Sequence, residues 1–205
     1  MLEKRGGAKR PVAKDKHERI LKAAVKIFAK HGFHNSKISQ IAKEAGVADG
    51  TIYLYFKNKD DILINLFEKK IDAAIQDFNA SLVGLRDPIE KLRTFIIRYA
   101  EYMEKHQALA EVISVELRQS NKFMKEYVPV KFAEFLQILS MIIREGKDLG
   151  VFRRDIEPGI AKRAIFGALD ELILYWVLAP KPKYSTTQIG RNLADLFAEG
   201  LKARP

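Results

Sequence analysis

The chain has 205 residues, of which 47% are hydrophobic and 10% are aromatic, and this is enough apolar material for a packed core. Such a composition excludes a largely disordered protein. No apolar run approaches the roughly 18–20 residues of a membrane span, and the charged start of the chain lacks the apolar segment of a signal peptide. The sequence contains no cysteine, which excludes disulfides and thiolate metal sites and is consistent with a cytoplasmic location.

The net charge of +10 is concentrated in the first part of the chain. Residues 1–59 contain 14 Lys and Arg against 5 Asp and Glu, a net charge of +9, whereas residues 60–205 contain 22 against 21, a net charge of +1. A concentrated basic face attracts polyanions, because each neutralised phosphate releases condensed counterions. On charge alone, a solubilising segment or a membrane-surface segment remains an alternative.

The first 81 residues predict a flexible basic arm, residues 1–14, followed by four helices. Apolar residues recur at three- and four-residue spacing, and glycines or capping residues separate the periodic segments. The four helices should begin near Asp15, Ser36, Ala48 and Asn58 and end near Gly32, Gly46, Tyr55 and Ser81. The second and third helices are short and are separated by a turn of two or three residues.

The remainder of the chain predicts only helices. The expected segments are Pro88–Lys105, Ala108–Leu117, Asn121–Leu149, Pro158–Leu178 and Thr186–Lys202. Pro129 should kink or divide the third of these, because proline removes a backbone hydrogen bond. The sequence shows no alternating strand pattern and no internal repeat, so we expect an all-α protein of about nine helices. Residues 15–59 should form one domain and residues 60–205 the other.

The short helices near residues 36–56 have the layout of a DNA-binding helix-turn-helix. A small apolar set would hold the two helices together: Ile38, Ile41, Val47, Ile52 and Phe56. The outward residues of the second helix would then be free to enter the major groove, N-terminal end first. These are Ala48, Asp49, Gly50, Thr51, Tyr53 and Tyr55, and Lys57 and Lys59 follow them.

Three segments of this region resemble the N-terminal domain of TetR-family repressors: "AAVKIFAKHGF", "ISQIAKEAG" and "VADGTIYLYFKNKDDIL". The resemblance implies that the first three helices bind DNA and that the others form a ligand-binding and dimerising domain. It places Thr51, Tyr53, Tyr55 and Lys57 on DNA, and Ser36, Lys37 and Ser39 on phosphates. For the tyrosines the alternative is packing, and for Lys57 and Lys59 it is a solvated surface.

Two positions depart from the pattern of the family. A capping Ser or Thr is frequent where this chain has Lys37, and Ser36 is the expected substitute. Many relatives have Ser-Lys where this chain has Ala48-Asp49. An acidic side chain is repelled by phosphate, so we expect Asp49 to accept a hydrogen bond from a cytosine amino group instead.

The second domain is rich in large apolar residues at helical spacing. The candidates for lining a ligand cavity are Phe95, Tyr99, Tyr102, Met103, Val115, Phe132, Phe135, Leu139, Phe166, Leu169, Tyr175 and Trp176. A helical bundle can enclose an elongated apolar cavity. For each residue alone the alternative is ordinary core packing.

The segments "ELRQSN" and "IFGALDE", together with Trp176, resemble the acyl-CoA-responsive regulators of fatty-acid degradation within the TetR family. This resemblance implies a repressor of fatty-acid degradation genes that long-chain acyl-CoA releases from a palindromic operator. The phosphates of the CoA headgroup would need cations, for which the candidates are Arg93, Arg98, Arg118 and Lys131. For each cation the alternative is a surface ion pair. Asp170, alone among apolar neighbours, favours a structural role.

The last two long helices have broad apolar faces that suit a homodimer interface. The residues expected there are Ile189, Leu193, Leu196, Phe197 and Leu201. Two-fold symmetry would present two recognition helices about 34–36 Å apart, which is one turn of DNA.

No enzyme motif, metal-ligand spacing or cofactor-binding loop occurs in the sequence, so we expect a protein that is not an enzyme and needs no cofactor. Two alternatives remain. The effector of the repressor could be a hydrophobic drug or another lipid. The chain could also be a basic helical protein that binds membranes or RNA electrostatically.

Overall fold

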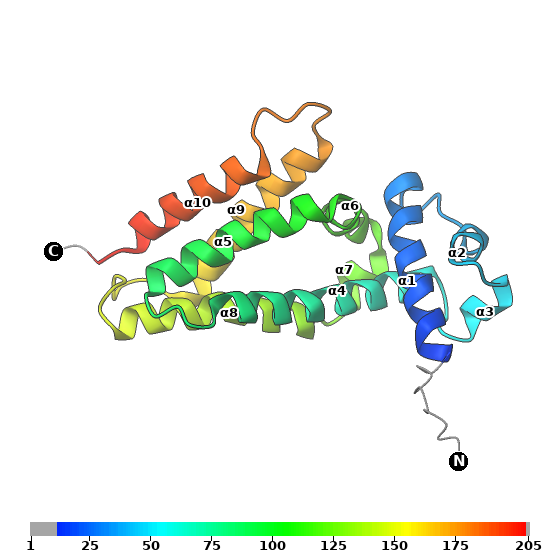
Figure 1. Ribbon diagram of the computed structural model, residues 1–205, viewed down its shortest axis with the longest axis horizontal. Helices are drawn as coiled ribbons and strands as arrows, with labels where there is room; N and C mark the ends of the chain where they lie inside the picture. Colours follow the sequence, from blue (N-terminus) through cyan, green and yellow to red (C-terminus); the bar gives the residue numbers. More distant parts are fainter. Residues whose placement is uncertain (1–11, 204–205) are drawn as a thin grey trace, which may run out of the picture.

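The computed structural model describes residues 12–203, which form ten α-helices and one 3-10 helix and contain no strand (Figure 1). The helices are α1 (Val12–His31), α2 (Ile38–Ala45), α3 (Asp49–Tyr53), α4 (Lys59–Leu82), α5 (Pro88–Lys105), α6 (Gln107–Ser114), η1 (Glu116–Gln119), α7 (Asn121–Lys125), α8 (Val130–Asp148), α9 (Pro158–Leu178) and α10 (Thr186–Leu201). The all-α prediction is confirmed. Residues 12–14, expected in the arm, belong to α1, and the rest of the predicted arm lies outside the described residues.

Helices α1, α2 and α3 pack together at one end of the molecule (Figure 1). Gly32 follows the end of α1 and Gly46 follows the end of α2, and both glycines have positive φ, +75° and +64°, which a side chain would disfavour. Arg19 of α1 donates hydrogen bonds to the carbonyl oxygens of Ala45 and Gly46, at 2.6 and 3.0 Å. This guanidinium fixes the turn between α2 and α3 against α1, a contact that the periodic pattern does not predict.

Helix α4 connects that end of the molecule to the bundle. The Asn58 side chain accepts from the amide of Asp61, as predicted, and α4 then continues for 24 residues. At 1.5 Å per residue, these 24 residues span about 36 Å. One rigid element therefore begins immediately after the helix-turn-helix and forms part of the bundle core.

Helices α4, α5, α8 and α9 pack around the apolar core of the bundle, and α10 lies along α5 (Figure 1). The predicted bounds of α5 and α9 agree with the structure, and α10 ends one residue earlier than expected. The segment expected as Ala108–Leu117 is α6 followed by the separate 3-10 turn η1, and Pro129 divides the next segment into α7 and α8. Proline thus breaks that helix rather than bending it.

Candidate nucleic-acid interface and ligand cavity

The N-terminal end of α3 is exposed, as a recognition helix requires. Ala48, Asp49 and Gly50 are exposed, and the Tyr53 side chain retains 59% of its accessible surface. Ile52, on the opposite side of α3, is fully buried, and Phe56 is 2% exposed. The small apolar set that was predicted to hold the two helices together is therefore present, and it leaves the small residues of α3 exposed.

Tyr55 differs from Tyr53, although the family resemblance implies a DNA contact for both. Tyr55 is half-buried, and its ring lies 6.0 Å from the His17 ring and 6.4 Å from the Phe56 ring. Thr51 is also half-buried, and Lys57 is exposed. Packing against neighbouring rings thus buries part of the Tyr55 side chain, whereas the side chains of Tyr53 and Lys57 are exposed to solvent.

The sequence interpretation of Ser36 needs correction. Ser36 is 4% exposed, and its hydroxyl donates to the carbonyl oxygens of Gly32 and Ile27, at 2.6 and 3.2 Å. It therefore braces the loop after α1 and does not cap α2. Lys37 occupies the N-cap position without a side-chain cap, and its amide donates to Gln40 Oε1 at 2.8 Å. Lys37 and Ser39 are exposed beside the N-terminus of α2.

Lys59 also has partners within the chain. Its ammonium donates to the carbonyl oxygens of His34 and Ser36, at 2.9 and 3.1 Å, and lies 4.6 Å from the centre of the Phe33 ring. Burial lowers the pKa of Lys59, against the opposing effect of Asp60. The predicted phosphate contact of Lys59 would require these hydrogen bonds to break, so its position favours a structural role.

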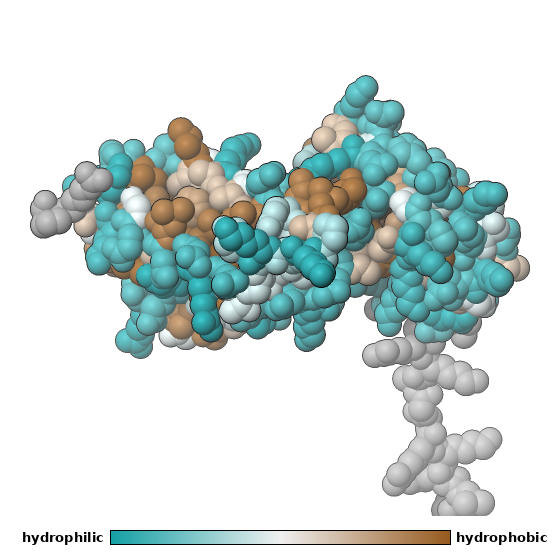
Figure 2. Space-filling view, turned by 90° about the horizontal axis from the view of Figure 1, so that it is seen from above, coloured by the Kyte–Doolittle hydropathy of each residue, from teal (hydrophilic) through white to brown (hydrophobic). Residues whose placement is uncertain are grey.

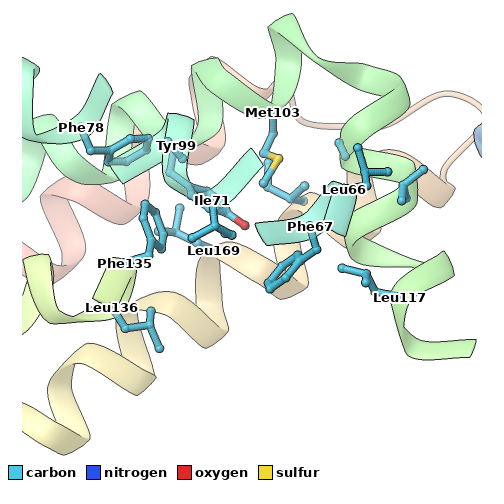
Figure 3. Close-up of a cluster of buried hydrophobic side chains, with 14 of the residues drawn as sticks. Leu66, Phe67, Ile71, Phe78, Tyr99, Met103, Leu117, Phe135, Leu136 and Leu169 are labelled. Carbon is cyan, nitrogen blue, oxygen red and sulfur yellow. The ribbon is translucent and has the colours of Figure 1, made fainter. Parts of the chain in front are cut away.

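The bundle contains a small apolar cavity between α4, α5, α6, α8 and α9. Six of the predicted ligand residues line it: Tyr99, Tyr102, Met103, Phe132, Phe135 and Phe166. Figure 3 shows Phe78, Tyr99 and Phe135 directed toward one another between their helices. The free volume is only about 30 Å³, because aromatic side chains fill the space. One end of the cavity extends along α4 to Phe67 and Lys70.

The other predicted ligand residues lie outside the cavity lining. Phe95, Leu139 and Leu169 are fully buried core residues, and Val115 is half-buried at the end of α6. Tyr175 accepts a hydrogen bond from the Lys183 amide at 3.0 Å, and Trp176 lines a separate surface pocket near Pro180. For these residues the structure favours core packing or a position away from the cavity.

The four predicted headgroup cations all have acidic partners. Arg93 pairs with Asp195, Arg98 with Asp77, Arg118 with Asp170, and Lys131 with Asp72 and Glu134. Asp170 is thus paired in the structure. Burial raises its pKa, and Arg118 opposes that effect. The surface-ion-pair alternative therefore describes these residues better than a free phosphate site.

One hydrogen bond ties the bundle to the helix-turn-helix end, two more hold the segment around α7 against α4, and the sequence interpretation missed all three. Glu116 of η1 is 5% exposed and accepts from the Phe33 amide at 2.5 Å. Ser120 donates to Asp60 at 2.6 Å, and Tyr127 donates to Glu68 at 2.9 Å. These contacts join residues 59–83 positions apart, so spacing along the chain could not show them.

The surface over α9 and α10 carries exposed apolar side chains, and Figure 2 shows hydrophobic residues gathered on this side of the bundle. The exposed ones include Tyr175, Leu178, Tyr184 and Leu196. Ile189, Leu193 and Leu201, predicted for a dimer interface, are instead 4–7% exposed, because α10 packs on α5. Leu196, at 65% exposure, remains available. Within residues 12–203, no helix is both long and apolar enough to cross a bilayer.

The comparisons with known proteins place both regions in one family. Residues 20–66 match the model of bacterial regulatory proteins of the tetR family, and residues 67–200 match that of the YsiA-like protein, C-terminal region. The chain is 37% identical over 186 residues to the fatty acid metabolism regulator protein of Bacillus subtilis, covering 91% of this chain and 95% of that protein.

Two solved structures have the same fold. The fatty acid degradation regulator FadR from Bacillus halodurans has a TM-score of 0.84 at 35% identity and covers 98% of this chain and 100% of its own. FadR from Bacillus subtilis, solved in complex with stearoyl-CoA, has a TM-score of 0.84 at 36% identity and covers 90% and 99%. These relatives are regulators rather than enzymes. The chain belongs to the TetR family of bacterial transcriptional regulators and, within it, is similar to the regulators of fatty-acid metabolism.

Proposed function

We propose that this protein is a cytoplasmic, dimeric repressor of fatty-acid degradation genes, and that long-chain acyl-CoA releases it from its operator. The observation that carries the proposal is the apolar, aromatic-lined cavity of a chain with a TM-score of 0.84 to a regulator solved with stearoyl-CoA. An acyl chain requires such a lining, because its transfer from water to an apolar environment is favourable.

The DNA-binding surface comprises α3 and the residues beside it. The small exposed residues at positions 48–50 would allow the helix end to approach base edges, and the exposed Asp49 would accept from a cytosine amino group. Tyr53, Lys57 and Ser39 are exposed on this end of the molecule and are assigned to phosphate contacts. Lys37 supplies a further cation beside α2.

A dimer would place two such surfaces on the two halves of a palindromic operator. The exposed apolar residues over α9 and α10 supply the contact, and Leu172 and Leu196 line a groove of about 510 Å³ between these helices. This interface uses the part of α10 that α5 leaves uncovered.

Helix α4 provides a route from the cavity to DNA. Phe67, Ile71 and Phe78 of α4 form one wall of the cavity, whose free volume is only about 30 Å³. An acyl chain can enter only if these side chains move apart, since about 30 Å³ accommodates roughly one water molecule. The N-terminus of α4 carries Lys59, which is hydrogen-bonded to the loop before α2. Displacement of α4 would therefore reorient the helix-turn-helix.

Selection from a random duplex library, followed by mass spectrometry of the purified protein, tests this function. We expect one palindromic sequence to be preferred over random DNA by at least about a thousandfold. We also expect the protein to copurify with long-chain acyl-CoA. A protein without sequence preference would instead be a non-specific electrostatic binder.

A second candidate function keeps the repressor but changes its effector to a hydrophobic drug or another lipid, because an aromatic-lined cavity also suits such molecules. A competition assay separates the two. Stearoyl-CoA should displace a bound hydrophobic cation of similar length, whereas the drug-responsive alternative predicts the reverse order of affinity.

A further inference from the structure

Residues 120–131, which we call the strap, contain α7 and lie along α4. Three polar residues of the strap each contact a carboxylate of α4: Ser120 with Asp60 at 2.6 Å, Tyr127 with Glu68 at 2.9 Å, and Lys131 with Asp72 at 3.2 Å. The carboxylates follow one another after eight and four residues, a spacing that places them along one side of a helix. The strap is therefore attached to one side of α4 at both of its ends and between them.

The inner side of the strap is aromatic and packs on Phe67 of α4. The Phe67 ring lies 5.1 Å from the ring of Phe123 and 6.3 Å from that of Tyr127, and the latter two rings stack on each other. Phe67 also lines the cavity, together with Phe132 at the end of the strap, 6.2 Å away. Figure 3 shows Phe67 at the far end of the apolar cluster from Phe78. The strap thus covers the Phe67 end of the cavity.

The outer side of the strap is apolar as well. Met124, Val128 and Val130 each keep more than half of their accessible surface, and Pro129 between the two valines is exposed. Exposed apolar side chains that are adjacent rather than scattered are typical of a surface that meets an apolar partner. An acyl chain that approached here would therefore meet apolar surface on both sides of the strap.

The three attachments differ in how easily they can open. Ser120 is 1% exposed and also caps α7, so it is fixed at the beginning of the strap. The Lys131 ammonium is shared between two carboxylates at the surface, and such ion pairs contribute little. Burial raises the pKa of Tyr127, and the hydrogen bond to Glu68 and the charges of Glu68 and Asp72 raise it further, so the phenol remains a donor. One hydrogen bond of this kind can be broken transiently.

We propose that the strap is the gate through which the acyl chain enters the cavity, with the Tyr127–Glu68 hydrogen bond as its latch and Ser120 as its hinge. This inference rests on the proposed function and assigns an entrance to it. When the latch opens, the rings of Phe123 and Tyr127 would leave Phe67, which could then turn away from the cavity. The strap would close again over the bound chain and keep water from it.

Stopped-flow measurement of stearoyl-CoA binding to the full chain, without DNA, tests the gate. Tyr127→Phe keeps the ring and removes the hydroxyl that forms the latch. We expect its association and dissociation rates both to rise about five- to tenfold, because opening precedes entry and exit, while Kd changes less than about twofold. Tyr184→Phe is the matched control, because Tyr184 lies between α9 and α10, outside the strap and the cavity lining. It should change neither rate.

An unchanged association rate in Tyr127→Phe would overturn the gate, and so would a rise of the dissociation rate alone, which indicates a loosened binding site. Operator release is measured separately, so gated binding of stearoyl-CoA without DNA release would contradict the proposed function and not the gate.

Hydrogen exchange of the ligand-free protein tests the latch without any effector. In Tyr127→Phe the backbone amides of the strap should exchange at least about threefold faster, while those in the second half of α8 should be unchanged. Glu68→Gln keeps an acceptor without its charge and should give an intermediate rate. Exchange of the strap at the same rate in Tyr127→Phe and the unsubstituted chain would show that this hydrogen bond does not hold the strap.

Discussion

The two regions of this protein treat their charges differently. In the bundle, the arginines and the lysine that the sequence singled out are paired with carboxylates of neighbouring helices. In the helix-turn-helix, Lys37, Lys43 and Lys57 have no such partner within residues 12–203. The net charge is +9 over residues 1–59 and +1 over residues 60–205, and part of the excess in the first region lies on these exposed, unpaired lysines. Unpaired cations attract phosphate, whereas paired cations contribute to structure.

Aromatic residues show the opposite contrast. Tyr53 of the helix-turn-helix is 59% exposed, while Phe78, Phe95 and Phe135 of the bundle are at most 2% exposed. The aromatic side chains of the bundle line an interior that suits an apolar ligand. The helix-turn-helix instead exposes a tyrosine side chain to solvent. Lys70 differs from the cations of both regions. It is half-buried in the wall of the apolar cavity, and it has no ion pair within residues 12–203.

The largest effect should come from Phe56, which is 2% exposed and stacks on His17 at 5.0 Å. Phe56→Ala should destabilise the helix-turn-helix by about 3–5 kcal/mol and abolish operator binding, because it opens a cavity in a small core. Chemical denaturation followed by circular dichroism measures the loss. Leu54→Ala is the control, since Leu54 is 81% exposed and its truncation should leave stability nearly unchanged. Equal stabilities of the two variants would contradict the packing described.

A smaller loss of stability should follow substitution in the bundle at Gly146. A methyl group at this position would overlap the buried Phe152 ring, so Gly146→Ala should cost about 1–3 kcal/mol despite the better helix propensity of alanine. The double variant with Phe152→Leu should recover part of that cost, because the smaller side chain relieves the overlap. Strict additivity in thermal unfolding would argue against this contact. Operator affinity of the folded protein should be unchanged.

Lys57 and Lys59 differ in whether their charge is free to meet DNA. Lys57→Ala should weaken operator binding about tenfold and reduce the slope of log K against log salt by about one, since Lys57 is exposed and unpaired. Lys59→Ala should leave the salt slope unchanged and instead lower stability, because its ammonium holds two carbonyl oxygens. Fluorescence anisotropy at several salt concentrations distinguishes them. A loss of salt slope in both variants would show that Lys59 binds phosphate.

The smallest effect concerns His17, whose pKa is lowered by burial and by Lys69, against an opposing effect of Glu18. A histidine with a lowered pKa binds its proton more readily in the unfolded state. Its contribution to stability is therefore present above the ordinary pKa of 6.5 and is lost as the pH falls below it. Replacement by glutamine should make the decrease in melting temperature between about pH 7 and about pH 5 shallower. An unchanged decrease would place the sensitivity elsewhere.

The sequence was sufficient for most of the fold because local signals determine it. The glycines after α1 and α2, the Asn58 cap and the proline at the start of α5 mark helix ends through backbone chemistry that acts within a few residues. The exposed α3 surface followed from the same signals. The separation of η1 from α6 did not, and Glu116 of η1 is held by a contact with Phe33, 83 residues earlier in the chain.

The candidate sites were less predictable because they depend on partners far along the chain. Periodicity placed Arg93 and Arg118 near apolar stripes, but their carboxylates come from α10 and α9. The same pattern could have indicated Lys70, since a charge in the inward stripe of α4 between Phe67 and Ala74 is unusual. Ser36 matched a phosphate-binding position, yet its hydroxyl is used by the preceding loop.

The dissociation constant of the operator complex, measured with and without saturating stearoyl-CoA, tests the central claim most directly. If filling the bundle displaces α4, stearoyl-CoA should weaken operator binding by about a hundredfold, and operator should weaken stearoyl-CoA binding by the same factor, because binding coupling is reciprocal. An operator affinity that stays constant while stearoyl-CoA is bound would contradict the account.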